Sequence, residues 1–127
     1  MKFLLMIYTD DTLLDAIPAA EADTMMHGCF MHADELRERG ELLDSQQLES
    51  PATAKSVRLR NQRLSVIDGP FAETKEYLAG FNVIEARDMA EAIRIASEFP
   101  WTRTGCIEIR PLRDLDAVRR RVGALRE

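Results

Sequence analysis

The connection at residues 68–76 carries side chains that could do acid–base chemistry. It reads DGPFAETKE. Asp68 could act as a proton acceptor or a ligand anchor if the turn directs its carboxylate into a pocket. The alternative is a rigid structural turn, because an aspartate accepts from nearby backbone N–H groups, glycine adopts unusual dihedrals and proline fixes its own φ. Phe71 would then anchor the turn in the core. The sequence leaves both interpretations of Asp68 open.

The charged residues after this turn extend the candidate site. A turn by itself does not require Glu73, Lys75 or Glu76. They could be solvated charges that protect a strand edge from pairing. Alternatively, Lys75 and a glutamate could line a polar cleft between a sheet and its helices. On this second interpretation, the predicted ligand-binding residues are Tyr8, Phe71, Glu73 and Lys75.

Two histidines lie in residues 19–39, a segment whose apolar side chains recur with helical spacing. At about 100° per residue, His32 falls at the edge of the apolar face, whereas His27 falls on the opposite, polar side. His32 could reach a pocket between helix and sheet and form a catalytic pair with Asp68. It could equally be a structural residue at the edge of the core. Histidine titrates near neutral pH, so either role can be tested.

The sequence contains no pattern for a metal or a nucleotide cofactor. The histidines and the acidic pair Asp10-Asp11 lack the ligand spacing that is typical of zinc or iron sites. No P-loop, GxGxxG motif or nucleophile elbow is present. We therefore expect neither a metal nor a cofactor.

Composition narrows the class of protein further. The 127 residues suit one domain, and 46% apolar with 31% charged residues is an ordinary globular composition. A net charge of −5 argues against nucleic acid as a partner, because phosphate binding needs a basic surface. Cys29 and Cys106 are expected to be buried thiols in a reducing compartment. No apolar run reaches the roughly 18 residues of a membrane span. These features predict a cytoplasmic protein that does not bind membranes.

Hydrophobic periodicity predicts the elements that must position these residues. Strands are expected at residues 3–8, 42–43, 56–60, 64–66, 77–83 and 106–110. Helices are expected at residues 19–39, 89–99 and 114–127. The predicted buried face of the first helix consists of Ala22, Met26, Cys29, Ala33 and Leu36. Gly28 interrupts this helix, which suggests close approach of another backbone or of a ligand. Asp88 and Glu91 fit a capping box at the start of the second helix.

The order of these elements predicts the fold. The strands at residues 56–60 and 64–66 are expected to form an inserted β-hairpin. Without it, the order is βαββαβ, as in ferredoxin-like α+β folds, with two helices on one face of an antiparallel sheet. The strand at residues 77–83 and the residue that follows carry apolar side chains on both sides: Leu78 and Ile84 on one, Phe81 and Val83 on the other. A second subunit is the simplest cover for the other face, so we predict a homodimer with its sheets face to face, a dimeric α/β barrel.

Several segments resemble one known family. DGPFAETKE is followed by YLAGFNVIEARD, a helix and IEIRP, and it is preceded by MKFLLMIY and TAKSVRLRNQRLSVIDGPF. These segments are similar to the YCII-related family, specifically its DGPF branch, over residues 1–111. The resemblance implies a ferredoxin-like dimeric α/β barrel for residues 1–111. Residues 112–127 would then be a separate amphipathic helical tail.

The resemblance implies less about function. One branch of the wider family is a dehydrochlorinase with a proposed His–Asp acid–base pair, whose histidine position falls near Cys29 here, so neither His27 nor His32 aligns with it. Some DGPF proteins occur beside sigma factors or are fused to them. Two hypotheses therefore remain. One is a small-molecule binding protein or enzyme with a sheet–helix pocket. The other is a non-catalytic accessory protein that binds a partner such as a sigma factor through its basic tail.

Overall fold

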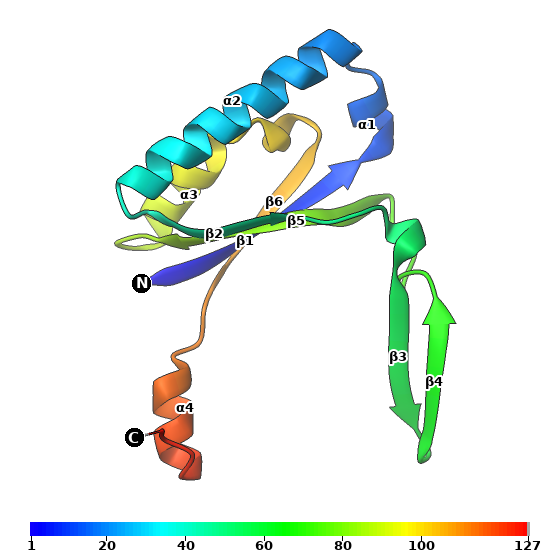
Figure 1. Cartoon of the computed structure of the whole chain (residues 1–127), viewed down its shortest axis with the longest axis vertical. Coiled ribbons are helices and arrows are strands. Elements are labelled where there is room, and N and C mark those ends of the chain that lie inside the picture. Colours follow the sequence, from blue (N-terminus) through cyan, green and yellow to red (C-terminus); the bar gives the residue numbers. More distant parts are fainter. Residues whose placement is uncertain (127) are drawn as a thin grey trace.

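The computed structural model describes residues 1–126 and has a four-stranded sheet with two long helices on one face (Figure 1). The strands are β1 (Lys2–Asp10), β2 (Leu42–Gln47), β3 (Lys55–Arg60), β4 (Arg63–Asp68), β5 (Glu76–Glu85) and β6 (Gly105–Pro111). The α-helices are α1 (Asp11–Asp15), α2 (Ala19–Glu38), α3 (Met89–Ser97) and α4 (Leu115–Val122), and two 3₁₀ turns lie at Pro51–Thr53 and Pro100–Arg103. The predicted tail also included Glu127, which lies outside the described residues.

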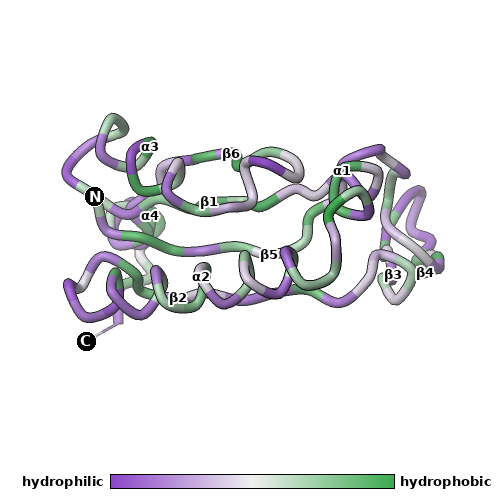
Figure 2. The backbone as a smooth tube through the Cα atoms, turned by 90° about the horizontal axis from the view of Figure 1, so that it is seen from above, coloured by the Kyte–Doolittle hydropathy of each residue, from purple (hydrophilic) through white to green (hydrophobic). Residues whose placement is uncertain are grey.

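The four-stranded sheet has the order β2-β5-β1-β6, and each neighbouring pair is antiparallel. Figure 2 shows these strands side by side in this order. The order is compatible with a ferredoxin-like α+β fold, as predicted. β3 and β4 pair only with each other, in a separate antiparallel sheet joined through the Asn61-Gln62 turn. Both turn residues have positive φ, as the two central residues of a type I′ hairpin turn do.

The hydrophobic core lies between the sheet and the helices α2 and α3. The buried residues of α2 are Met25, Cys29, Ala33 and Leu36. The last three belong to one core cluster with Phe3 and Leu5 of β1 and Ile84 of β5. Met25 takes the buried place that the sequence assigned to Met26. No atom of another segment comes within 4 Å of the Cβ position at Gly28, so no other backbone of residues 1–126 approaches this glycine closely, and the predicted backbone approach is wrong within the chain.

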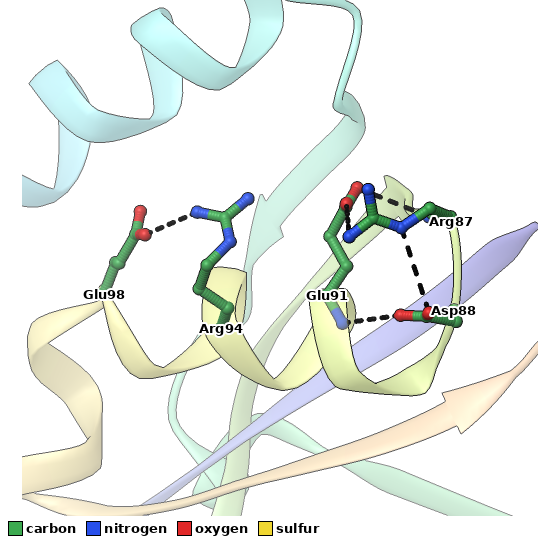
Figure 3. A network of polar contacts seen from close by, with 5 residues as sticks. All are labelled: Arg87, Asp88, Glu91, Arg94 and Glu98. Carbon is green, nitrogen blue, oxygen red and sulfur yellow. Dashed lines mark hydrogen bonds and ion pairs between the residues drawn. The ribbon is translucent and has the colours of Figure 1, made fainter.

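The start of α3 confirms the predicted cap. The Asp88 carboxylate accepts a hydrogen bond from the Glu91 backbone N–H at 2.9 Å. The Glu91 carboxylate accepts from the backbone N–H of Arg87 at 3.3 Å, and its other oxygen lies 3.2 Å from the Arg87 guanidinium (Figure 3). One turn later, Arg94 donates to Glu98 at 2.8 Å. The Asp88 contact satisfies one free backbone donor of the first turn and marks where α3 begins.

A bulge in β5 changes which side chains face the helices. Ile7 pairs with Gly80, but the next residue, Tyr8, pairs with Leu78, so Ala79 is the extra residue. The extra residue shifts the alternation, and Leu78 therefore lies on the same sheet face as Tyr8. The prediction that Leu78 shares a face with Ile84 is wrong for this reason.

The sheet face opposite α2 and α3 has no cover within residues 1–126. Its side chains include Leu4, Met6, Phe81 and Val83, all half-buried in the single chain. The β3–β4 hairpin and α4 both project on this side, at opposite ends of the sheet (Figure 1). None of the helices within residues 1–126 has the length and apolar character needed to cross a membrane.

Candidate functional site

A cavity of about 310 Å³ lies between α2 and the sheet. Its floor is formed by strands β1, β2 and β5, its roof by α2, and its inner end by the turn at Pro100–Arg103. The side chains at its centre include Ile7, Thr9, Met26, Cys29, Asn82 and Trp101. Ala22, Ala79 and Gly80 also line it, and their small side chains leave the space unfilled.

The polar groups of this cavity come from the strands and the turn. Thr9, Asn82 and Thr104 are all buried and all line it. Asn82 is 3% exposed and lines the cavity, whereas the buried side-chain atoms without a hydrogen-bond partner in residues 1–126 are His32 Nε2 and Glu41 Oε2. Asn82 faces the helices because it pairs in register with the buried Leu5. A carboxamide in this position offers two N–H donors and an acceptor oxygen to a molecule in the cavity.

Cys29 and Trp101 form the inner wall of the cavity. The indole N–H of Trp101 donates to the sulfur of Cys29 at 3.2 Å. Burial raises the pKa of the Cys29 thiol, and the indole hydrogen bond opposes this only in part. A thiol with a raised pKa stays protonated at neutral pH and is a poor nucleophile. Cys29 is buried as predicted, whereas Cys106 is exposed on β6.

Tyr77 and Asp23 lie at the mouth of the same cavity. The Tyr77 hydroxyl donates to the Asp11 carboxylate at 2.7 Å. This hydrogen bond, together with burial, raises the pKa of Tyr77 to about 12. The Tyr77 hydroxyl is therefore neutral at physiological pH and stays hydrogen-bonded to Asp11, so it does not act as a general base. The amide of Gln47 reaches the Met26 sulfur at 3.4 Å, which joins β2 to α2 at the rim.

Lys75 and Tyr8 line a different cavity, of about 560 Å³, beside the uncovered sheet face. The carboxylate of Asp10 reaches this cavity and lies 3.5 Å from the Lys75 ammonium. Asp10 caps α1 and accepts from the Thr12 hydroxyl at 2.6 Å and from its backbone N–H at 2.9 Å. The hydroxyl contact is the main reason that the pKa of Asp10 is lowered, although its carboxylate is only 6% exposed.

Phe71 and Glu73 line a third cavity, of about 610 Å³, which also includes Tyr8. Of the predicted ligand-binding residues, Tyr8, Phe71 and Glu73 thus line one cavity. Tyr8 also lines the neighbouring cavity together with Lys75. The Phe71 ring is 80% exposed, so the expectation that it anchors the turn in the core is wrong. The reason is that the turn leaves the sheet with the projecting hairpin, where no core lies within the chain (Figure 1).

The predicted catalytic residues, Asp68 and His32, lie in different parts of the molecule. Asp68 ends β4, its side chain is 85% exposed, and its carboxylate accepts from Lys55. His32 lies on α2 with Nε2 3.3 Å from a carboxylate oxygen of Glu98, and its ring packs edge-on against Phe99 at 4.8 Å. Neither residue lines any of the three cavities. A single chain therefore does not assemble this pair.

The sequence argument missed Asn82, Thr9 and Trp101 as candidate site residues. A signal for Asn82 was present, because it is a polar residue inside the apolar strand GFNVIE. Within residues 1–126, no group of three or more histidine, cysteine or acidic side chains is arranged to hold a metal ion.

Comparisons with known proteins place the chain in a family. The model of the YCII-related domain matches residues 1–116, which extends into the first residues of α4. A protein of Rhizobium meliloti (strain 1021), named only as uncharacterised, is 31% identical over 114 residues, which cover 88% of this chain and 92% of that protein. The match covers the sheet, both long helices and the hairpin. The chain therefore belongs to the YCII-related domain family.

Proposed function

We propose that this protein binds a small molecule in the cavity between α2 and the sheet. The observation that carries the proposal is the buried carboxamide residue Asn82 in a cavity lining that is otherwise mostly apolar. Small-molecule sites are typically apolar clefts of about 300–1,000 Å³ with a few well-placed polar groups. The cavity of about 310 Å³ is at the lower end of this range, which favours a compact ligand.

The proposal is for binding and does not include acid–base catalysis by Asp68 and His32. The groups of this cavity that can ionise are Asp23, Cys29 and Tyr77. The pKa values of the thiol and the phenol are both raised, so neither is poised to exchange protons near neutral pH. Asp23 lies at the exposed rim of α2 and not at the buried end.

The experiment uses the single tryptophan of the chain, Trp101, as a reporter inside the cavity. Toluene is titrated against the protein while Trp101 fluorescence and the thermal midpoint are recorded. We expect a saturable change in the native protein and its loss in Ala22→Leu, because the larger side chain occupies the cavity. Ala20→Leu, on the exposed side of the same helix, is the matched control and should keep the response. A saturable response that survives Ala22→Leu would contradict the proposal.

We also propose that a second copy of the chain covers the uncovered sheet face, giving a dimeric α/β barrel. Leu4, Met6, Phe81 and Val83 support this, because an antiparallel sheet that is apolar on both faces needs a second cover. The hairpin supports it too, since Val57, Leu59, Leu64 and Val66 share one exposed face. A lone two-stranded hairpin is marginally stable in water, so a contact from another subunit would stabilise it.

A second candidate function is the docking of a partner protein, such as a sigma factor, on α4. This helix supports the idea because Leu115 and Val122 are exposed beside the basic residues 119–121. We expect that deletion of residues 114–127 would abolish recovery of such a partner in a pull-down while the dimer is retained. Unchanged recovery would count against this function.

A further inference from the structure

We infer that the ligand of the α2–sheet cavity is an uncharged molecule with a carboxamide-like edge, which Asn82 recognises. This inference rests on the proposed function, because it concerns the same cavity. It goes further in naming the chemical class of the ligand and the residue that selects it.

The first step is the charge of the lining. The cavity residues include no lysine, arginine or histidine, and Asp23 is their only carboxylate. A second carboxylate, Asp11, lies behind the wall and holds the Tyr77 hydroxyl. A ligand with a negative group would lose its hydration without gaining a cation, which is strongly unfavourable in a buried site. The lining therefore selects against carboxylates and phosphates.

The second step is the hydrogen-bonding capacity at the buried end. A carboxamide offers two N–H donors and an acceptor oxygen with two lone pairs. Asn82 is 3% exposed and lines the cavity, so these groups are positioned to meet a molecule that enters it. A ligand that offers one donor and one acceptor side by side, as a primary amide or a lactam does, can satisfy both sides of Asn82 at once. A hydrocarbon of the same shape would offer this group no hydrogen bond.

The third step compares Asn82 with the other polar groups of the lining, which have less hydrogen-bonding capacity left for a ligand. The Trp101 indole N–H is already committed to the Cys29 sulfur at 3.2 Å. The hydroxyl of Thr104 is 3.5 Å from the carbonyl oxygen of Trp101. Thr9 is buried in the same floor and its hydroxyl offers one donor, so it can assist Asn82. The apolar body of the ligand would then lie against Ile7 and Met26.

The test compares four ring compounds of similar size by Trp101 fluorescence and by thermal shift. Toluene is apolar, benzamide carries the neutral amide, benzoate is its anionic counterpart and benzylamine is cationic. We expect benzamide to bind about tenfold more tightly than toluene or benzylamine, and benzoate to give no saturable signal. In Asn82→Leu, the advantage of benzamide over toluene should disappear while toluene still binds.

The outcomes separate the two proposals. If toluene binds and is blocked by Ala22→Leu, but benzamide has no advantage or benzoate binds equally well, the ligand class is wrong and the cavity remains a binding site. If none of the four compounds gives a saturable signal, the proposed function fails and the ligand class fails with it. The comparison of the four compounds uses the native chain. It therefore tests the ligand class even if Asn82→Leu does not fold.

Discussion

At the scale of single residues, two hydrogen bonds define the environment of the cavity mouth and its inner wall. The Tyr77 hydroxyl binds the Asp11 carboxylate, and the Trp101 indole binds the Cys29 sulfur. The Asp11 contact raises the pKa of Tyr77, and burial raises the pKa of Cys29 although the indole hydrogen bond opposes that rise. Raised pKa values leave both groups neutral at pH 7, which suits the proposed binding of an uncharged ligand better than proton transfer.

The Tyr77–Asp11 contact predicts a specific titration. The folded-state pKa of Tyr77 is raised to about 12, above the unfolded value near 10, so its contribution to stability is complete below pH 10 and is lost as pH rises towards 12. In an ultraviolet absorbance titration of the native protein, we expect a tyrosinate step near pH 12. This step should be absent in Tyr77→Phe and should move towards pH 10 in Asp11→Asn. A native Tyr77 that ionises near pH 10 would contradict the contact.

At the scale of the elements, two glycines differ in what their backbone meets. Gly105 starts β6 at a point where a Cβ atom would overlap the carbonyl oxygen of Tyr8, which lies on the neighbouring strand. Gly28 lies inside α2, is exposed, and has no other segment within 4 Å of its Cβ position. The first glycine is required by packing between strands, whereas the second weakens its helix without a steric reason.

Paired alanine substitutions test this difference. Gly105→Ala should lower the free energy of unfolding by roughly 1–3 kcal/mol, because the strands must move apart. Gly28→Ala should raise it by about 1 kcal/mol through helix propensity alone. Chemical denaturation with urea measures both changes. A stability of Gly105→Ala equal to that of the native protein would show that β1 and β6 do not approach closely at this point.

At the scale of the whole molecule, the apolar residues are distributed over two sides of one sheet. One side is buried under α2 and α3, and the other is flanked by the hairpin and α4 (Figures 1 and 2). The proposed second copy would cover the latter side and leave the α2–sheet cavity unaffected, because that cavity lies on the opposite face. Ligand binding and dimer formation should therefore be separable by mutation.

A charge placed on the uncovered face tests the dimer. Phe81→Glu should convert the dimer to a monomer in analytical ultracentrifugation, because two carboxylates would be buried between the sheets. Phe30→Glu is the matched control, since Phe30 is 55% exposed on α2. It should leave the dimer intact. Circular dichroism establishes that both variants are folded, and a monomeric native protein would overturn the proposal.

The sequence by itself determined the strands, the three other α-helices and their order, but not the short helix α1. The period of residues 19–39, the Asp88–Glu91 cap and the alternation around Asn61-Gln62 are local signals, and each is present in the structure. Such signals depend on neighbours within a few residues, so no tertiary contact is needed to see them. For the DGPF segment the sequence left a rigid turn and a functional site both open. In the structure Gly69 has a positive φ and its backbone N–H donates to the Ala54 carbonyl at 2.7 Å.

Only the tertiary structure decided where the candidate site lies. The cavity is formed by Thr9, Cys29, Asn82 and Trp101, which come from four separate segments of the chain. A single extra residue, Ala79, moved Leu78 to the other face of β5, and no local pattern encodes that shift. His32 and Asp68 were grouped by their chemistry, but the chain places one against α3 and the other on the hairpin. The site depends on long-range packing, because the space between a helix and a sheet is set by the side chains of both.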